Sequence, residues 1–265
     1  MTTSSRDVFE SPAEERRATS MPLAVRASSF GIDARAYAEL RPSYPIQAVR
    51  WGLGGATGRI LDLGAGTGKL TETLVALASD VAAVEPDPSM RAELERLLPQ
   101  VPVLDGAAET IPLGDGSVDA VFVGQALHWF DFDLALTEIA RVLRPSGALV
   151  ALWNHDDVGV PWVAEFAALA RTTTVSRHWS DPAGSLPRHS RFTAFERRQY
   201  PNPHQYTVDS LIAMVCTQSQ MLLATADERQ RRTTALRTFL AGQAATASGE
   251  FDLPMTTTVI RAFTS

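Results

Sequence analysis

Residues 61–70 read LDLGAGTGKL, and this stretch decides the fold. Its first three residues belong to the short apolar run 59–63. Leu70, Leu74 and Leu77 then recur at helical spacing. Glycines let the chain turn sharply and let main-chain N–H groups approach a ligand without an intervening Cβ. The segment is therefore predicted to form a strand, a ligand-binding glycine loop and a helix.

Strands and helices alternate around this segment up to residue 154. Apolar runs bounded by turn residues predict further strands at 81–85, 101–104, 118–123 and 148–153. The segments between them carry apolar residues at helical spacing, and Asp87 with Pro88 supplies a cap and a first-turn proline for one of these helices. This alternation indicates an α/β, doubly wound fold, with a parallel sheet covered by helices on both faces.

The pattern loosens beyond residue 154, and no repeat or low-complexity linker interrupts the chain. Helices are predicted near 163–171, 208–215 and 236–240, and strands near 195–200 and 256–262.

Residues 1–27 show no apolar periodicity and are predicted to be a flexible tail. We expect 28–265 to be a single domain. It is divided into a cofactor-binding core (28–154), a substrate-side insertion and lid (155–250) and a closing strand (251–265).

Composition excludes several classes of protein. The longest apolar run, 147–153, falls far short of the roughly 20 residues of a membrane helix. The N-terminus has no apolar region typical of a secretory signal, so we expect a cytoplasmic protein. The single cysteine, Cys216, can form neither an internal disulfide nor a cysteine metal site, and is predicted to be a buried, inert thiol. The net charge of -6 argues against nucleic-acid binding.

The glycine loop favours a cofactor without phosphates. A dinucleotide-binding loop needs a third glycine where this chain has Lys69. In addition, Asp62 stands just before the loop, where a carboxylate would repel a pyrophosphate but accept hydrogen bonds from an ammonium group. At the end of the next strand, Glu85 is placed to accept the hydroxyls of a ribose, and Pro86 to pack on an adenine face.

Five stretches together resemble the successive motifs of class I S-adenosylmethionine-dependent methyltransferases. The resemblance is closest to the small-molecule branch that includes the trans-aconitate and ubiquinone-pathway enzymes, and it covers about residues 30–154. It implies a Rossmann-like fold with a mostly parallel, seven-stranded sheet, an elaborated C-terminal half, and S-adenosyl-L-methionine as cofactor. The stretches are LDLGAGTGKL, AVEPDPSM, GAAETIPL, VDAVFVGQALHWF and EIARVLRPSGAL.

The resemblance also implies roles for individual residues. It assigns Asp62, Gly64 and Gly66 to the methionine part of the cofactor, and Gln125 to a position beside that part or the transferable methyl group. Glu85 becomes the ribose ligand and Pro86 an adenine neighbour. Many relatives read the adenine amino group with an aspartate where this chain has Ala107, so we expect the backbone of Ala107 and Ala108 to meet the ring edge. Tyr37 and Arg41 resemble residues that fold over the cofactor.

The implied reaction is an in-line displacement at an activated methyl group, so orientation and exclusion of water supply most of the catalysis. A carboxylate acceptor needs no base, whereas a hydroxyl would benefit from His128 or His155. Both histidines, and Trp129 beside His128, equally fit a packing role. No metal is expected.

The C-terminal half is rich in arginine. Residues 171–237 hold ten arginines against five acidic residues. This excess suggests a small anionic acceptor such as a carboxylic acid, drawn in by guanidinium groups; a solvated basic face is the alternative. Two other functions stay open, an NAD(P)-dependent oxidoreductase and a non-catalytic S-adenosylmethionine-binding module.

Overall fold

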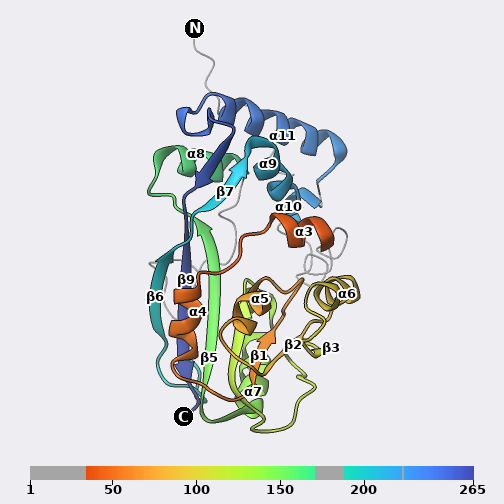
Figure 1. Cartoon of the computed structure of the whole chain (residues 1–265), viewed down its shortest axis with the longest axis vertical. Helices are drawn as coiled ribbons and strands as arrows, with labels where there is room; N and C mark the ends of the chain where they lie inside the picture. The colour runs from red at the N-terminus through yellow and green to blue at the C-terminus, as the bar shows by residue number, and fades with distance from the viewer. Residues whose placement is uncertain (1–33, 171–187, 223) are drawn as a thin grey trace.

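The structure is a computed structural model that describes residues 34–170, 188–222 and 224–265. A large sheet with its covering helices fills the lower part of the view in Figure 1, and a smaller group of helices and strands lies above it. The expected tail 1–27, and the arginines Arg171 and Arg177, lie outside the described residues.

The large sheet has seven strands in the order β3-β2-β1-β4-β5-β9-β6. The first five are parallel, and β9 runs antiparallel between β5 and β6. The predicted mostly parallel, seven-stranded sheet is thus confirmed. Its strands are β1 (Ile60–Leu63), β2 (Val81–Val84), β3 (Val103–Leu104), β4 (Val118–Gly124), β5 (Leu143–Asp156), β6 (Glu196–Pro201) and β9 (Met255–Phe263).

Helices cover both faces of this sheet, and the alternation of side chains along β4 shows how. Val121 and Val123 pack toward α7 (Phe132–Val142), while Ala120 and Phe122 pack toward the opposite face. Strands buried on both sides read as continuous apolar runs, which is why the sequence revealed them. The second face is covered by α4 (Ile46–Leu53) and α5 (Lys69–Val75), and α6 (Pro88–Leu97) lies beside β2 and β3.

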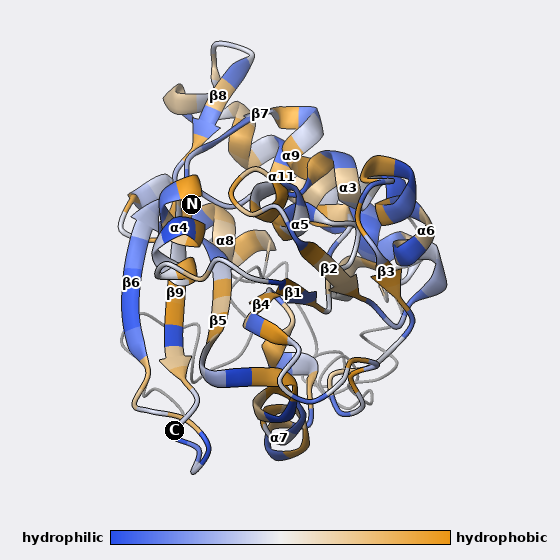
Figure 2. Cartoon of the chain, turned by 60° about the horizontal axis from the view of Figure 1, so that its bottom comes forward, coloured by the Kyte–Doolittle hydropathy of each residue, from blue (hydrophilic) through white to orange (hydrophobic). Residues whose placement is uncertain are grey.

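The edge of the sheet is protected by charge. Figure 2 shows β6 as largely hydrophilic beside the more hydrophobic β9 and β5. Its sequence, ERRQYP, places charged side chains on the unpaired edge, which discourages pairing with another chain.

The C-terminal half builds a separate apolar cluster, around Phe166, Leu211 and Leu236, in the group of elements above the large sheet in Figure 1. A two-stranded sheet, which was not predicted from the sequence, packs with this cluster. Its strands, HQYT and EFDL, are too short for a period of two to be told from other patterns. The elements are α8 (Pro161–Ala170), β7 (His204–Thr207), α9 (Val208–Cys216), α10 (Ser219–Leu222), α11 (Ala226–Ala241) and β8 (Glu250–Leu253).

Two expectations from composition can be compared with the described residues. Cys216 is partly buried at the end of α9, and burial raises the pKa of its thiol, in keeping with low reactivity. Among the described helices, none combines the length and apolar character needed to cross a membrane.

Candidate active site

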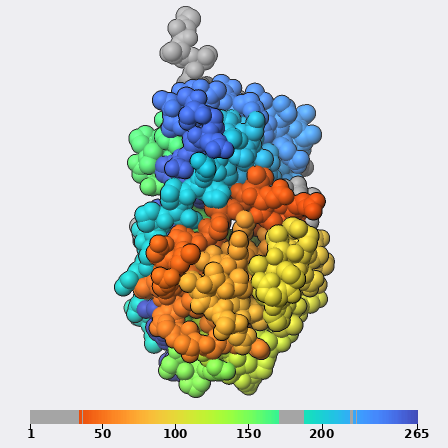
Figure 3. All heavy atoms as spheres, in the orientation of Figure 1, coloured from red at the N-terminus to blue at the C-terminus, as the bar shows by residue number. Residues whose placement is uncertain are grey.

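A pocket opens at the carboxyl ends of β1 and β4, beside α3 (Ala34–Leu40). In the space-filling view of Figure 3, the α3 segment crosses the front of the molecule between the C-terminal elements, in blue above, and the segments drawn in orange and yellow below. This is the edge where ligands bind in open parallel sheets. The pocket is lined by Tyr37, Tyr44, Asp62, Gly64, Ala65, Gly66, Thr67, Lys69, Leu70 and Gly124.

The glycine loop adopts a backbone that only glycine accepts easily. Gly64 and Gly66 have φ angles of 69° and 57°, in the left-handed region. A Cβ at Gly64 would lie 2.9 Å from the Cβ of Ala126, whereas a Cβ at Gly66 would meet no atom within 4 Å. The backbone at Gly66 therefore faces open pocket, and a ligand can approach it closely.

Asp62 carries an unsatisfied carboxylate oxygen at the base of this pocket. The side chain is fully buried, and Oδ2 accepts a hydrogen bond from the Thr71 hydroxyl at 2.6 Å. Oδ1 is buried and has no hydrogen-bond partner among the described residues. Burial raises the pKa of Asp62 to about 7. An unpaired buried carboxylate is costly, so the site is suited to a ligand that brings a cation.

Glu85 directly follows β2, and its carboxylate is hydrogen-bonded to the backbone of the glycine loop. Its Oε2 accepts from the backbone N–H of Gly66 at 2.8 Å, and Oε1 accepts from that of Asp87 at 2.9 Å. Burial raises the pKa of its carboxyl. Each carboxylate oxygen has a second lone pair, so these bonds are compatible with the predicted contacts to ribose hydroxyls.

The predicted adenine neighbours lie along the following loops. Pro86 is exposed, Ala107 is partly exposed and Ala108 is buried. Ala107 forms an isolated bridge with Thr110, which folds the loop back on itself. This bridge fixes the backbone at Ala107, the position where many relatives have an aspartate.

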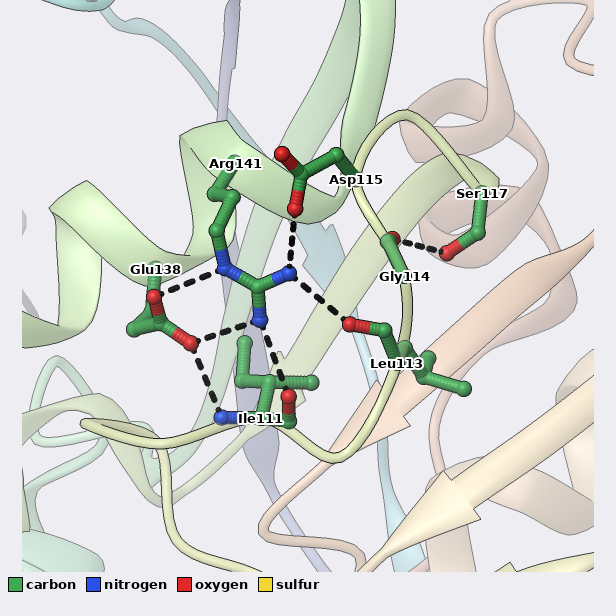
Figure 4. A network of polar contacts seen from close by, with 7 residues as sticks. All are labelled: Ile111, Leu113, Gly114, Asp115, Ser117, Glu138 and Arg141. Carbon is green, nitrogen blue, oxygen red and sulfur yellow. Dashed lines mark hydrogen bonds and ion pairs between the residues drawn. The ribbon is translucent and has the colours of Figure 1, made fainter.

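Arg141 on α7 holds the continuation of that loop (Figure 4). It makes a two-pronged contact with Glu138 at 2.8 and 2.7 Å, and reaches Asp115 at 2.8 Å. It also donates to the carbonyl oxygens of Leu113 (2.8 Å) and Ile111 (2.9 Å). All five guanidinium N–H groups are used, which fixes the loop that follows Ala107 and Ala108.

Gln125 follows the last residue of β4 and has an unusual backbone. Its φ of 56° lies in the left-handed region, which is unfavourable for residues other than glycine. Two bonds hold it there, from its N–H to Leu152 O (2.9 Å) and from Nε2 to the backbone oxygen of Asn154 (3.0 Å). It adjoins Gly124, which lines the pocket.

Tyr37 on α3 and Arg41, which directly follows this helix, have different surroundings. Tyr37 lines the pocket, and its role in covering the cofactor stays a prediction. The guanidinium of Arg41 lies 4.8 Å from the centre of the Tyr37 ring and bonds to the hydroxyl and carbonyl oxygens of Thr217, at 3.1 and 3.3 Å. Arg41 therefore joins this segment to the residue after α9, and pairing with the cofactor carboxylate would compete with those bonds.

The two histidine candidates lie outside the described pocket lining. His128 is in a short 3₁₀ turn (Leu127–Trp129), with its ring 4.6 Å from that of Trp129. His155 lies near the end of β5, paired in register with Thr256 on β9. A catalytic role for either stays a prediction.

Several pocket residues were not singled out as ligands from the sequence, among them Tyr44, Thr67 and Lys69. A Cβ at Gly124 would stand 2.8 Å from the Tyr44 hydroxyl, so this glycine makes room for the tyrosine. The Thr67 hydroxyl oxygen is buried without a hydrogen-bond partner among the described residues. Lys69, the only lysine of the chain, also lines the pocket. The side chains of Tyr44, Thr67 and Lys69 thus add hydrogen-bond donors to the pocket that Asp62 lines.

Comparisons with known proteins agree with this geometry. A family profile described as "Methyltransferase domain" matches residues 61–151. An uncharacterized methyltransferase of Mycobacterium tuberculosis is 41% identical over 235 residues, covering 88% of this chain and 95% of that protein. The chain belongs to the class I S-adenosylmethionine-dependent methyltransferases.

Other relatives support the assignment. The structure of a type II methyltransferase from Anaeromyxobacter dehalogenans covers 84% of this chain and 97% of its own, with 26% identity and a TM-score of 0.63. A malonyl-[acyl-carrier protein] O-methyltransferase of Methylococcus capsulatus is 36% identical over 137 residues, 46% of this chain and 47% of that protein. The methyltransferase is thus an enzyme with S-adenosylmethionine as its cofactor, and neither the oxidoreductase nor the non-catalytic alternative holds.

The residues present fit that cofactor. Its methionine part carries an ammonium group, which would supply the missing partner of Asp62 Oδ1. The open space at Gly66 accommodates a ligand against the backbone. Glu85 is the second carboxylate at the loop, and Pro86 follows it on the exposed side.

The raised pKa of Asp62 predicts a pH-dependent affinity. The carboxylate must be ionised to bind an ammonium group, whereas in the free protein it is protonated below pH about 7. Binding then has to expel a proton, so affinity for S-adenosylhomocysteine should fall about tenfold per pH unit below that point. Calorimetric titrations from about pH 5.5 to 8.5 measure this slope. A flat profile below pH 7 would contradict the Asp62 assignment.

Proposed function

We propose that this methyltransferase transfers a methyl group to a small-molecule acceptor, with carboxylic acids as the acceptor class to test first. The observation that carries the cofactor placement is the buried, unpartnered Oδ1 of Asp62 beside the open backbone at Gly66. We place the methionine end there, the ribose at Glu85 and the adenine along Pro86, Ala107 and Ala108.

The bound cofactor supplies a methyl group that its sulfonium already activates. The chain's own residues orient that group and keep water away. Tyr37 and Tyr44 bring aromatic surface to the pocket, and Asp62 fixes the ammonium end. Holding reactants in a productive geometry accounts for up to about 7–11 kcal/mol of a barrier in favourable cases.

A carboxylic acid acceptor is supported by the reaction chemistry, since a carboxylate needs no general base. The malonyl-carrier O-methyltransferase among the relatives is named for a malonyl acceptor, which points to the same class. The arginines add little support. Arg188 and Arg191 are exposed, Arg198 lies over the Trp51 ring and Arg237 pairs with Asp209. These contacts fit a solvated basic face.

The acceptor is identified by screening pooled metabolites for release of S-adenosylhomocysteine. We expect turnover with carboxylic acids and none with their amides or neutral analogues of the same size. If the arginines recruit the acceptor, KM rises with ionic strength and with Arg188→Ala or Arg191→Ala. A preference for neutral acceptors would contradict the proposed class.

Removing the Glu85 carboxylate should weaken cofactor binding. We expect Glu85→Ala to cost about 1.5–3 kcal/mol of affinity, because it deletes a charged hydrogen-bond acceptor. Calorimetry with S-adenosylhomocysteine measures the change. Glu93→Ala is a matched control, since Glu93 is also a buried glutamate but pairs with Arg96 on α6. Equal affinity in the parent and Glu85→Ala would show that the ribose lies elsewhere.

A further inference from the structure

Chain segments that are far apart in the sequence meet at the side chain of Asn154, near the end of β5. Its amide nitrogen donates to the carbonyl oxygens of Pro42 (3.3 Å) and Ser43 (3.2 Å). Its amide oxygen accepts from Thr257 Oγ1 on β9 (2.6 Å) and from Asn202 Nδ2 after β6 (3.1 Å). Both N–H groups and both lone pairs are therefore used.

These partners also fix which way the amide points. If nitrogen and oxygen were exchanged, the amide oxygen would face two carbonyl oxygens, which can only accept. Asn202 Nδ2 adds a second donor to Ser43 O at 3.0 Å. The segment 42–43 is thus held by N–H groups of two asparagines, which lie at the carboxyl ends of β5 and β6, the two strands on either side of β9.

The anchored segment leads directly into the pocket. Ser43 precedes Tyr44, whose buried ring lines the pocket beside Gly124. On its other side, the backbone oxygen of Asn154 accepts from Gln125 Nε2 at 3.0 Å. Gln125 needs such support because its left-handed backbone is unfavourable for a residue with a side chain. One residue therefore supports both Tyr44 and Gln125.

We propose that Asn154 is a positioning residue for the methionine end of the cofactor. It holds the segment carrying Tyr44 and the turn carrying Gln125 in one arrangement around the glycine loop, without touching the cofactor itself. This inference rests on the proposed placement of the cofactor. It predicts that damage at Asn154 affects ligands with an amino-acid end more than ligands without one.

The test is Asn154→Asp. The substitution keeps the size and the oxygen that faces Thr257 and Asn202, but it turns a second oxygen toward the carbonyl groups of Pro42 and Ser43. We expect the Kd of S-adenosylhomocysteine to rise about tenfold, the scale of one or two lost hydrogen bonds. The Kd of 5′-deoxy-5′-methylthioadenosine, which lacks the amino-acid end, should stay within about twofold. Equal losses for both ligands, or no loss for either, would overturn the proposal.

Two further variants separate positioning from general damage. Thr257→Val removes a bond to the same amide oxygen but leaves both donors to 42–43 in place, so neither Kd should change by more than about twofold. Asn202→Ala removes the second donor to Ser43 and should show a smaller loss that is again confined to S-adenosylhomocysteine. If Asn154→Asp does not fold, Asn202→Ala decides the matter, and an unchanged ligand preference refutes the proposal.

The same titrations distinguish this inference from the proposed function. If the parent protein binds both ligands equally well, the amino-acid end is not held at Asp62 and the cofactor placement fails. If the parent prefers S-adenosylhomocysteine and Asn154→Asp keeps the full preference, the placement stands and only the role of Asn154 is wrong.

Discussion

Asp62→Asn is expected to raise the melting temperature of the cofactor-free protein while removing most of its affinity for S-adenosylmethionine. The parent buries a carboxyl whose pKa is raised to about 7 from a usual value of 3.8. Below pH about 4 the carboxyl is protonated in both the folded and the unfolded chain. As pH rises toward 7, the unfolded chain ionises and the folded one resists, so the parent loses stability.

The size of this effect follows from the shift. About 3 pKa units correspond to about 4 kcal/mol, and the amide of asparagine has no such cost. At about 2–4 °C per kcal/mol for a chain of this size, the difference in melting temperature should reach several degrees above pH 7. It should widen between about pH 4 and 7 and then level off.

Thermal melts of the two proteins across that pH range, with and without S-adenosylhomocysteine, measure both effects. Thr71→Val is a useful comparison, because it removes the hydroxyl that donates to Asp62 Oδ2 but keeps the carboxylate. A parent that is more stable than Asp62→Asn at pH 8 without ligand, or a variant that still binds tightly, would contradict the account.

Gly66→Ala is expected to lose more cofactor affinity than stability. In the cofactor-free protein nothing lies within 4 Å of the added Cβ, so the only loss of folding stability comes from the left-handed backbone at φ 57°. That strain is worth about 1–2 kcal/mol. With cofactor bound, the Cβ would occupy ligand space. Overpacking of this kind costs about 1–3 kcal/mol more, equivalent to about five- to 150-fold in Kd.

Gly116→Ala is the matched control. Gly116 has the same φ of 57° and equally open space at its Cβ, but it lies in the turn before β4, away from the pocket lining. The two variants should therefore lose similar stability in thermal melts, and only Gly66→Ala should lose affinity in calorimetry. Equal affinities would show that the cofactor does not approach the backbone at Gly66.

The sheet was predictable because its central strands are buried on both faces. Runs such as 118–123 and 148–153 contain almost only apolar residues, and the helices between them begin at recognisable caps such as Asp87, which accepts from two backbone N–H groups. The two-stranded sheet of β7 and β8 was missed because its short strands carry mixed residues. Their pairing depends on segments more than 40 residues apart, which no local pattern reveals.

The site was predictable where a local motif carries it. Asp62 is in β1 and Gly64 and Gly66 follow it on the loop, so all three reach the pocket together. Glu85 follows the next strand and contacts the backbone of Gly66. Lys69 belongs to the same motif, but the sequence showed only that it replaces a glycine. Tyr44 escaped notice for a different reason.

Tyr44 lies in the pocket because Asn154, which is remote in the sequence, holds the segment just before it. Asn154 holds Pro42 and Ser43 from 111 or more positions away. A contact of this kind depends on the completed sheet, since the amide acts only once β5, β6 and β9 are side by side. Sequence reasoning therefore identified candidate site residues at the strand ends, but it missed Tyr44, whose place in the pocket depends on the tertiary fold.

The most direct test of the central claim is a crystal structure of the protein with S-adenosylhomocysteine. The account predicts the amino group of the ligand within hydrogen-bond distance, about 3 Å, of Asp62 Oδ1, and the ribose hydroxyls at the Glu85 carboxylate. An amino group bound elsewhere, with Asp62 Oδ1 still unpaired beneath the ligand, would contradict it.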